Sequence, residues 1–151
     1  MLGLKRYLRN EKGFTMIEMM VVLIIIAVLI GAGIKFYAGY IENARVTKAK
    51  AQISTMQAAL DSYYAQKSEY PDSSGELINA GLRPATDFSS SKELDSTDPW
   101  GKKYKYEASG TSKYSVYTGH NKVQGQEGYH VVGKGENGES SPPEVSDNTT
   151  P

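Results

Sequence analysis

Residues 12–18, Lys12-Gly13-Phe14-Thr15-Met16-Ile17-Glu18, stand at the start of a long apolar run. The run from Phe14 to Ile34 has 21 residues, enough for a helix to cross the roughly 30 Å hydrocarbon core of a membrane. Glu18 is the only charged residue in it. Because a carboxylate at the centre of a bilayer costs about 2.5 to 3.5 kcal/mol, we predict that Glu18 is paired and functional.

The segment before the run is basic. It carries Lys5, Arg6, Arg9 and Lys12 against Glu11, a net charge of +3. Positive charge flanking a membrane helix favours the cytoplasmic side, so we expect the N-terminus inside and the chain after the helix outside.

The outer end of the run offers no good site for conventional signal-peptide cleavage. A secretory leader has a small-residue site after its apolar core, and Ala32-Gly33-Ile34 matches that pattern poorly. Here a small residue, Gly13, comes before the apolar run instead. The apolar helix is therefore expected to stay with the protein.

Residues 13–23, Gly-Phe-Thr-Met-Ile-Glu-Met-Met-Val-Val-Leu, resemble the N-terminus of type IV pilins and type II secretion pseudopilins. The resemblance implies cleavage between Gly13 and Phe14 by a membrane prepilin peptidase, which discards residues 1–13 as a leader. It also implies N-methylation of Phe14 by the same peptidase/N-methyltransferase.

Cleavage would create an α-amino group, with a pKa near 8, four residues before Glu18. Within one subunit this is the helical i, i+4 spacing, and an acid in the first turn also meets the positive end of the helix dipole. The resemblance implies a salt bridge between subunits, from Glu18 to the Phe14 amine of a neighbour in a helical homopolymer. The alternative is that Glu18 lies in the headgroup zone of an ordinary signal anchor, where a carboxylate costs far less.

The helix is predicted to continue from Phe14 to Ser68, because no proline interrupts it before Pro71. Residues 14–34 form the transmembrane or filament-core part, and residues 35–68 an amphipathic part. One apolar face recurs at three- and four-residue intervals: Ile41, Ala49, Ile53, Met56, Leu60, Tyr63 and Tyr64. Gly31 and Gly33 inside the apolar part are expected to weaken the helix, or to let another helix approach closely.

Residues 69–138 are predicted to form a small globular head. The helical period stops at the turn 70–75, and a short helix is expected near 76–80, followed by a polar loop over 83–97. Alternating residues predict strands at 104–107 and 113–118, and a third at 128–132, giving a sheet of about three strands. The fold class is therefore α+β: a long N-terminal helix packed on a small antiparallel sheet, as in type IV pilins.

A second resemblance lies in the head. Tyr70-Pro71 at the end of the long helix, followed by Asp98-Pro99-Trp100-Gly101 and a tyrosine-rich hairpin, resembles the major pseudopilin of type II secretion. We expect Tyr70, Pro71, Pro99 and Trp100 to be structural core residues, because large buried aromatics dominate small cores. Ligand binding by Trp100 is the alternative interpretation.

The metal site that this resemblance implies is not evident in the sequence. Major pseudopilins bind calcium in an aspartate-rich loop near the C-terminus, but residues 119–127 here contain one acid and a lysine. Glu136 and Glu139 are the remaining candidate carboxylates, whereas calcium takes six to eight oxygen ligands. We therefore predict no cofactor, with calcium at these two residues as the alternative. Residues 139–151 are rich in serine, proline, threonine and acids, so we predict that they form a disordered polar tail.

Enzyme and nucleic-acid functions have little support in the composition. There is no cysteine, His120 and His130 belong to no metal-ligand spacing, and no glycine-rich phosphate loop follows a strand. Without the leader the chain has 13 basic and 16 acidic residues, a net of −3, which does not favour nucleic acid. We expect the protein not to be an enzyme and not to bind nucleic acid directly.

The predicted function is that of a structural subunit of a type IV pilus-like filament, a cell-surface pilus or fimbrium. Its partners would be further copies of itself, the prepilin peptidase, the inner-membrane assembly platform and the assembly ATPase. The precursor would lie in the cytoplasmic membrane as a single-pass protein, and the filament outside. The alternatives are a major pseudopilin that drives protein export, and a monomeric signal-anchored binding protein.

Overall fold

The computed structural model describes residues 13–86, 92–119 and 130–146 in two compact units. The first unit ends at Tyr40 and the second begins at Ile41. Helix α1, Met16–Lys67, contributes to both. Its bounds confirm the predicted long helix to within two residues at each end.

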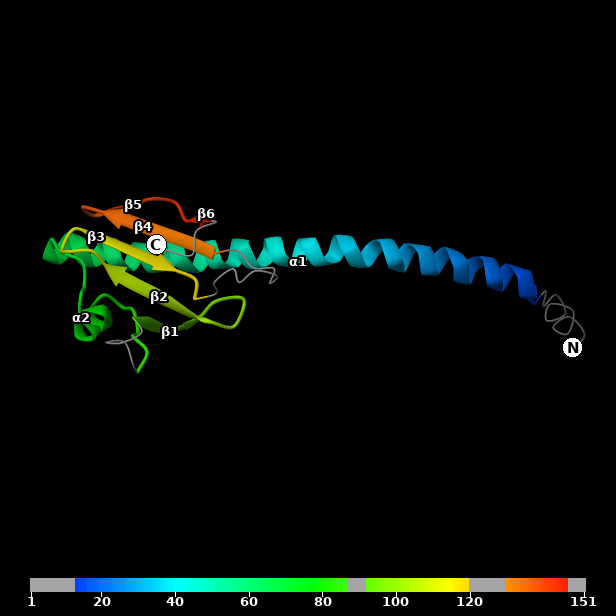
Figure 1. Cartoon of the computed structure of the whole chain (residues 1–151), viewed down its shortest axis with the longest axis horizontal. Coiled ribbons are helices and arrows are strands. Elements are labelled where there is room, and N and C mark those ends of the chain that lie inside the picture. Colours follow the sequence, from blue (N-terminus) through cyan, green and yellow to red (C-terminus); the bar gives the residue numbers. More distant parts are fainter. Residues whose placement is uncertain (1–12, 87–91, 120–129, 147–151) are drawn as a thin grey trace, which may run out of the picture. The chain divides into compact units, whose positions relative to one another are not determined.

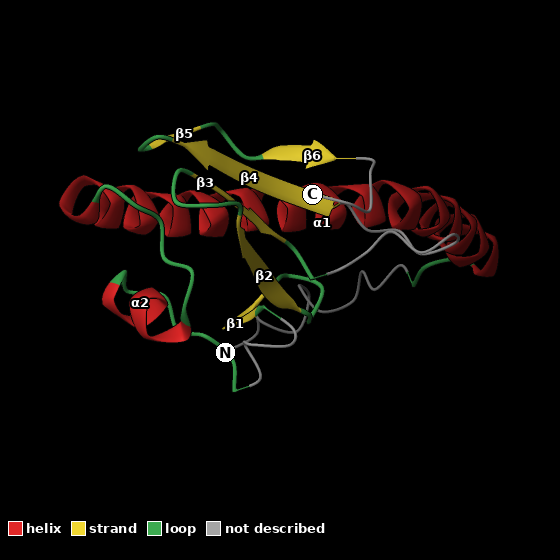
Figure 2. Cartoon of the chain, turned by 60° about the vertical axis from the view of Figure 1, so that its left-hand side comes forward, coloured by secondary structure: helices red, strands yellow, loops and turns green. Residues whose placement is uncertain are grey.

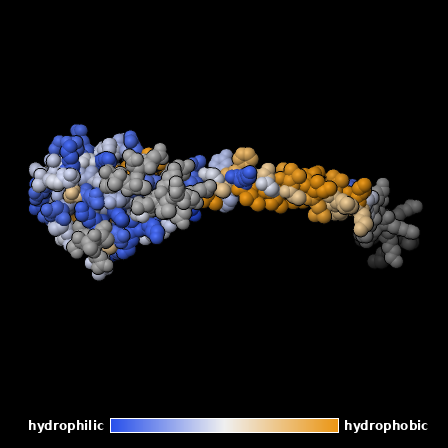
Figure 3. All heavy atoms as spheres, in the orientation of Figure 1, coloured by the Kyte–Doolittle hydropathy of each residue, from blue (hydrophilic) through white to orange (hydrophobic). Residues whose placement is uncertain are grey.

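In the first unit α1 exposes its apolar residues on every side. Large hydrophobic side chains from Phe14 to Tyr40 are 41 to 77% exposed, or 88% for Met16, and Figure 3 shows hydrophobic residues over most of the face of this stretch that it draws. Among the described residues, α1 is the one helix long and apolar enough to span a membrane. A helix that is apolar all round needs lipid or other helices against it, and packing among the residues that the structure describes does not supply this for the first part of α1.

The second unit is an antiparallel sheet packed on the rest of α1. The strands are β1 (Glu93–Thr97), β2 (Lys103–Ala108), β3 (Lys113–Tyr117), β4 (His130–Glu136), β5 (Glu139–Ser140) and β6 (Glu144–Ser146). They run in the order β1-β2-β3-β4-β5, and β6 pairs with β4 beside β5. Figures 1 and 2 both show the sheet lying along one side of this part of α1, with α2 (Ser74–Asn79) near the C-terminal end of α1.

The core forms where one face of α1 meets the inner face of the sheet. Ala49, Ile53, Met56 and Leu60 are buried at the predicted helical spacing. They pack with Leu77, Leu82 and Leu94 and with the inward residues of β2, β3 and β4, which are Tyr104, Tyr106, Tyr114, Val116 and Val131. Of the predicted face, Tyr63 is also buried, Tyr64 is partly buried and Ile41 is 38% exposed.

Buried polar side chains fix the register of α1 against the sheet. The Gln57 amide donates to the carbonyls of Lys134 (3.1 Å) and Ser141 (2.9 Å). The Tyr104 hydroxyl donates to Gln52 Oε1 at 2.8 Å. Burial raises the pKa of Tyr104, so this phenol stays protonated and remains a donor across the physiological pH range.

Strand β4 lies close to α1 at Gly133. A Cβ at this position would lie 2.4 Å from Ile53 Cγ2 and 2.9 Å from the Gln57 side-chain carbon Cδ. Only glycine leaves room for the backbone to come this near.

The sheet has six strands among the described residues, whereas the sequence predicted about three. Strands β2 and β3 lie at the predicted places, and β4 extends beyond the predicted third strand, whose first two residues are outside the described part. The missed strand β1 was predicted as loop, because it has a single buried apolar residue, Leu94. The outer edge of β1 pairs with the preceding loop: the Ala85 N–H donates to the Glu93 carbonyl, and the Asp95 N–H donates to the Arg83 carbonyl.

The prediction of a disordered tail from Glu139 is wrong for residues 139–146. Strands β5 and β6 lie there, and both pair with β4. Their polar composition suits an exposed edge, and pairing with β4 supplies the backbone hydrogen bonds that the composition does not reveal. Residues 147–151 are outside the described residues.

We predict that Gly133→Ala lowers the free energy of unfolding by about 1 to 3 kcal/mol, the usual effect of overpacking a core. Denaturant unfolding of the purified chain, followed by the fluorescence of its single tryptophan, measures the change. Gly75→Ala is the control, because a Cβ there meets nothing within 4 Å, and it should change stability by less than about 0.5 kcal/mol. Equal effects of the two substitutions would contradict the close approach at Gly133.

Candidate functional site

The predicted cleavage site lies ahead of α1. Gly13, Phe14 and Thr15 are not helical, and α1 begins at Met16. Phe14 is 77% exposed. The bond between Gly13 and Phe14 is therefore outside the helix, with an exposed aromatic side chain directly after it.

Glu18 and Thr15 cap the start of α1 reciprocally. Glu18 Oε2 accepts hydrogen bonds from the backbone N–H of Thr15 and from its hydroxyl, both at 3.1 Å. In return, Thr15 Oγ1 accepts from the Glu18 backbone N–H at 3.3 Å. This is the capping box that a threonine followed three residues later by glutamate forms at helix starts.

The capping box changes the interpretation of Glu18 in the uncleaved chain. Its carboxylate is the one acid in the first turn, where the helix dipole favours negative charge. Two donors from Thr15 already satisfy one of its oxygens, which lowers the cost of placing it near apolar surroundings. The predicted salt bridge of Glu18 to a neighbour's Phe14 amine stays a prediction.

The segment from Asp98 to Gly101 forms the turn between β1 and β2. Asp98 Oδ1 accepts from the backbone N–H groups of Trp100 (3.0 Å) and Lys102 (2.8 Å), and Asp98 is 4% exposed. Pro99 follows with the fixed φ that suits this turn position, and Gly101 has a φ of +87°. The buried Asp98 carboxylate therefore holds this turn by accepting hydrogen bonds from the turn's own backbone.

Trp100 is placed by this turn at the rim of the core. It is partly buried and packs against the core cluster. Its indole N–H donates to Glu42 Oε1 at 2.8 Å, and Glu42 Oε2 also lies 3.5 Å from Arg45. Trp100 therefore attaches the turn to α1, which agrees with the structural role expected for it.

Tyr70 and Pro71 lie in the core as predicted. Tyr70 is 2% exposed and Pro71 is fully buried. The Pro71 carbonyl accepts the Tyr106 hydroxyl at 2.7 Å. The Tyr70 ring contacts the rings of Tyr64 and Tyr114, with a centroid distance of 4.6 Å to each, and burial raises the pKa of Tyr70 to about 12.

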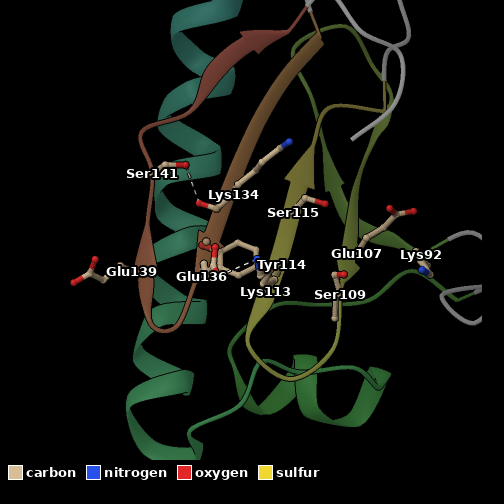
Figure 4. Close-up of a pocket in the computed structure, with 12 residues that line it drawn as sticks. Lys92, Glu107, Ser109, Lys113, Tyr114, Ser115, Lys134, Glu136, Glu139 and Ser141 are labelled. Atoms are coloured by element: carbon tan, nitrogen blue, oxygen red, sulfur yellow. Dashed lines mark hydrogen bonds and ion pairs between the residues drawn. The ribbon is translucent and has the colours of Figure 1, made fainter.

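The two candidate calcium residues face each other across β4 and β5 in the backbone register but do not form a metal cluster. Glu136 Oε1 pairs with Lys113 Nζ at 2.9 Å. Figure 4 shows the side chain of Glu139 pointing away from that of Glu136. Within the described residues no three histidine or acidic side chains gather as metal ligands.

A shallow groove of about 620 Å³ lies beside these residues, over β2, β3, β4 and β5 (Figure 4). It is lined by Lys92, Glu107, Ala108, Ser109, Lys113, Tyr114, Ser115, Lys134, Gly135, Glu136, Glu139 and Ser141. Its lining has no histidine or cysteine, and the Lys113–Glu136 ion pair occupies part of it. This mixture of lysine, glutamate and serine makes it a solvated polar surface.

Three residues that the sequence interpretation left out contribute to these arrangements. Thr15 caps α1, Glu42 holds Trp100, and Gln57 bonds two carbonyls of the sheet. The T-x-x-E pattern from Thr15 to Glu18 could have revealed the first. Glu42 and Gln57 bond groups 58 to 84 residues away, so local sequence carries no signal for them.

Comparison with known proteins gives two family matches that together cover most of the chain. Residues 37–134 match the model of type II secretion system (T2SS), protein G. Residues 8–34 match the prokaryotic N-terminal methylation motif.

Similar curated proteins are of two kinds. Type II secretion system core protein G of Pseudomonas aeruginosa is 33% identical over 111 residues, 68% of this chain and 78% of that protein. The protein of the same name from Escherichia coli is 33% identical over 102 residues, 63% and 70% of the two chains. A fimbrial protein of Neisseria meningitidis is 31% identical over 78 residues, 52% and 44%. No solved structure matches the chain significantly.

We predict that Thr15→Val frays the start of α1, because it removes a donor to Glu18 and the acceptor for the Glu18 N–H. The loss should be about 1 kcal/mol, the usual worth of an N-terminal cap. Amide hydrogen exchange in detergent micelles measures it at Glu18 and Met19. Thr15→Ser keeps the hydroxyl and should exchange as the unmodified chain does. Unchanged protection in the valine variant would show that the capping box does not hold the helix start.

Proposed function

Because the chain belongs to the family of type II secretion system protein G, we propose that it works as a structural, non-catalytic subunit of a pilus-like filament. Subunits join through the apolar part of α1 after cleavage between Gly13 and Phe14. The observation that carries the proposal is the lone carboxylate of Glu18 at the start of an apolar helix that the chain itself leaves exposed.

The exposed helix supports assembly on energetic grounds. Burial of apolar surface is worth about 25 cal/mol per Å², and the large apolar side chains of the first unit are 41 to 88% exposed. In the precursor, lipid covers this surface. In the filament, the helices of neighbouring subunits replace lipid, and a head-to-tail contact that does not close yields a helical polymer.

The distribution of charge supports the proposed membrane orientation and the order of cleavage and assembly. The leader's net charge of +3 keeps the N-terminus in the cytoplasm, where the peptidase acts on Gly13 and Phe14. Cleavage removes that charge, and the new α-amino group at Phe14, then methylated, becomes the partner for Glu18 of another subunit. The assembly platform and the assembly ATPase would move the subunit from the cytoplasmic membrane into the extracellular filament.

Of the two machines that use such filaments, the comparisons favour a type II secretion pseudopilus. The match to protein G covers residues 37–134 and so includes most of the second unit, which begins at Ile41. The match to a fimbrial protein covers 52% of the chain. A pilus for surface functions is the second candidate, supported by that match.

We predict that Glu18→Val permits membrane insertion and cleavage but abolishes filament assembly, because the Phe14 amine then has no carboxylate to meet. After co-expression with a prepilin peptidase, gel mobility measures cleavage, which also requires membrane insertion because the peptidase acts in the membrane. Electron microscopy of sheared filaments measures assembly. Normal filaments from the valine variant would contradict the proposed salt bridge.

Glu18→Gln separates charge from helix capping. Its amide oxygen still accepts from Thr15, so α1 starts normally, but it carries no charge. Failure of this variant to assemble would assign assembly to the charge, as proposed, and normal assembly would assign it to the cap. Glu69→Gln removes an exposed carboxylate elsewhere and should assemble normally.

Peptidase co-expression also tests the rival interpretation of a monomeric anchored protein. The filament proposal expects removal of the first 13 residues and an N-methylated Phe14 at the new N-terminus, seen by intact mass and N-terminal sequencing. A chain that keeps its N-terminus in the presence of active peptidase would favour the anchored monomer.

A further inference from the structure

The hairpin between β4 and β5 turns on Asn137 and Gly138. Their φ angles are +53° and +86°, the signature of a type I′ turn, and Glu136 pairs with Glu139 across it. The dipeptide Asn-Gly occurs once in the chain. The turn is therefore well formed, but it is built from the pair of residues most prone to spontaneous deamidation.

Deamidation begins when the backbone nitrogen of the following residue attacks the asparagine side-chain carbonyl. Here Gly138 N would form a bond to Asn137 Cγ, the Cγ–Nδ2 bond would break, and the amide proton would leave with Nδ2 as ammonia. Water then opens the cyclic succinimide to aspartate or to isoaspartate, with no change of oxidation state. Glycine in second position favours this attack, because it has no side chain to hinder the nitrogen.

The attacking nitrogen is held by a core residue. Gly138 N donates a hydrogen bond to the Tyr70 hydroxyl at 3.0 Å. That hydroxyl donates in turn to Asp61 Oδ1 on α1 at 3.3 Å. Tyr70 is 2% exposed, so its position is fixed by the surrounding core. Because attack on Asn137 Cγ removes the amide proton of Gly138, the hydrogen bond that this proton makes must break for the reaction to proceed.

Two further contacts fix the turn. The Tyr64 ring lies against Gly138, where a Cβ would come within 2.9 Å of Tyr64 Cδ1. The Asn137 N–H donates to the Ser112 carbonyl at 2.8 Å, which joins the turn to the loop before β3. The backbone on both sides of the reacting bond is therefore restrained, while the Asn137 side chain lies at the surface.

We propose that Asn137 is a latent deamidation site, and that the Tyr70 hydroxyl keeps it unreacted by holding Gly138 N. Tyr70 thus has a protective role in addition to its packing. Isoaspartate at position 137 would add one carbon to the backbone of a two-residue turn. The pairing of β5 with β4, and with it the contact of the Tyr114 hydroxyl with Ser140, would then be disturbed. The proposal does not depend on the proposed filament function.

The test compares deamidation of the full-length chain, in detergent micelles, with that of two phenylalanine variants. Tyr70→Phe removes the hydroxyl that accepts from Gly138 N. Tyr114→Phe is the matched control, because Tyr114 is about as buried as Tyr70 and its hydroxyl also bonds this hairpin, at Ser140, whereas Gly138 N donates to Tyr70. Mass spectrometry of the tryptic peptide 135–151 follows conversion of Asn137, and fragmentation separates it from Asn148 in the same peptide.

We expect Tyr70→Phe to raise the deamidation rate about fivefold over the unmodified chain, the factor that corresponds to roughly 1 kcal/mol for one net hydrogen bond. Tyr114→Phe should stay close to the unmodified rate, and the chain unfolded in urea should react faster than any folded form. Equal rates for Tyr70→Phe and the unmodified chain would overturn the proposal. So would equal acceleration by the two variants, which would assign the effect to general loosening, or a folded chain that reacts as fast as the unfolded one.

Discussion

The exposed apolar part of α1 is the constraint on which the rest of the protein depends. In the first unit the large apolar side chains of the described residues from Phe14 onward are 41 to 88% exposed, yet a helix of this kind is stable only in lipid or against other helices. The chain must therefore always have a partner, first the membrane and then further subunits. A single carboxylate, Glu18, interrupts the apolar surface near its start, and in the proposed filament this charge has the role of setting the register of neighbouring helices.

The second unit must fold without help from disulfides, since the chain has no cysteine. It relies instead on buried tyrosines whose rings pack in the core and whose hydroxyls bond fixed acceptors. Tyr104 reaches Gln52, Tyr106 reaches the Pro71 carbonyl, and Tyr70 reaches Asp61. Each ring contributes apolar burial, and each hydroxyl, kept protonated because burial raises its pKa, specifies one arrangement of helix and sheet.

Much of this could be predicted from the sequence, because the decisive signals are local. The length of α1, its buried face around Ile53 and Leu60, and strands β2 and β3 follow from spacing alone. Strands β1, β5 and β6 were missed because their stability comes from pairing with neighbours, not from their own side chains. The hydrogen bonds of Gln57 and Glu42 could not be predicted either, because their partners lie far along the chain. At the candidate site, the roles of Gly13, Phe14 and Glu18 stay predictions, whereas the capping by Thr15 was overlooked although its pattern is local.

The two units differ in what stabilises the helix they share. In the second unit, side-chain hydrogen bonds hold α1 at Glu42, Gln52, Gln57 and Asp61, so melting any turn there would break bonds to the sheet or its loops. In the first unit Gly31 and Gly33 have nothing within 4 Å of where a Cβ would stand, and each lowers helix stability by about 1 kcal/mol relative to alanine. The backbone hydrogen bonds of α1 at these glycines, and at Gly39, which has equally open surroundings, are therefore less costly to exchange for another arrangement than those in the second unit. If the helix rearranges as lipid gives way to neighbouring subunits, we therefore expect the change in the first unit, at its glycines, and we expect the tyrosine-bonded core from Ala49 onward to keep its structure.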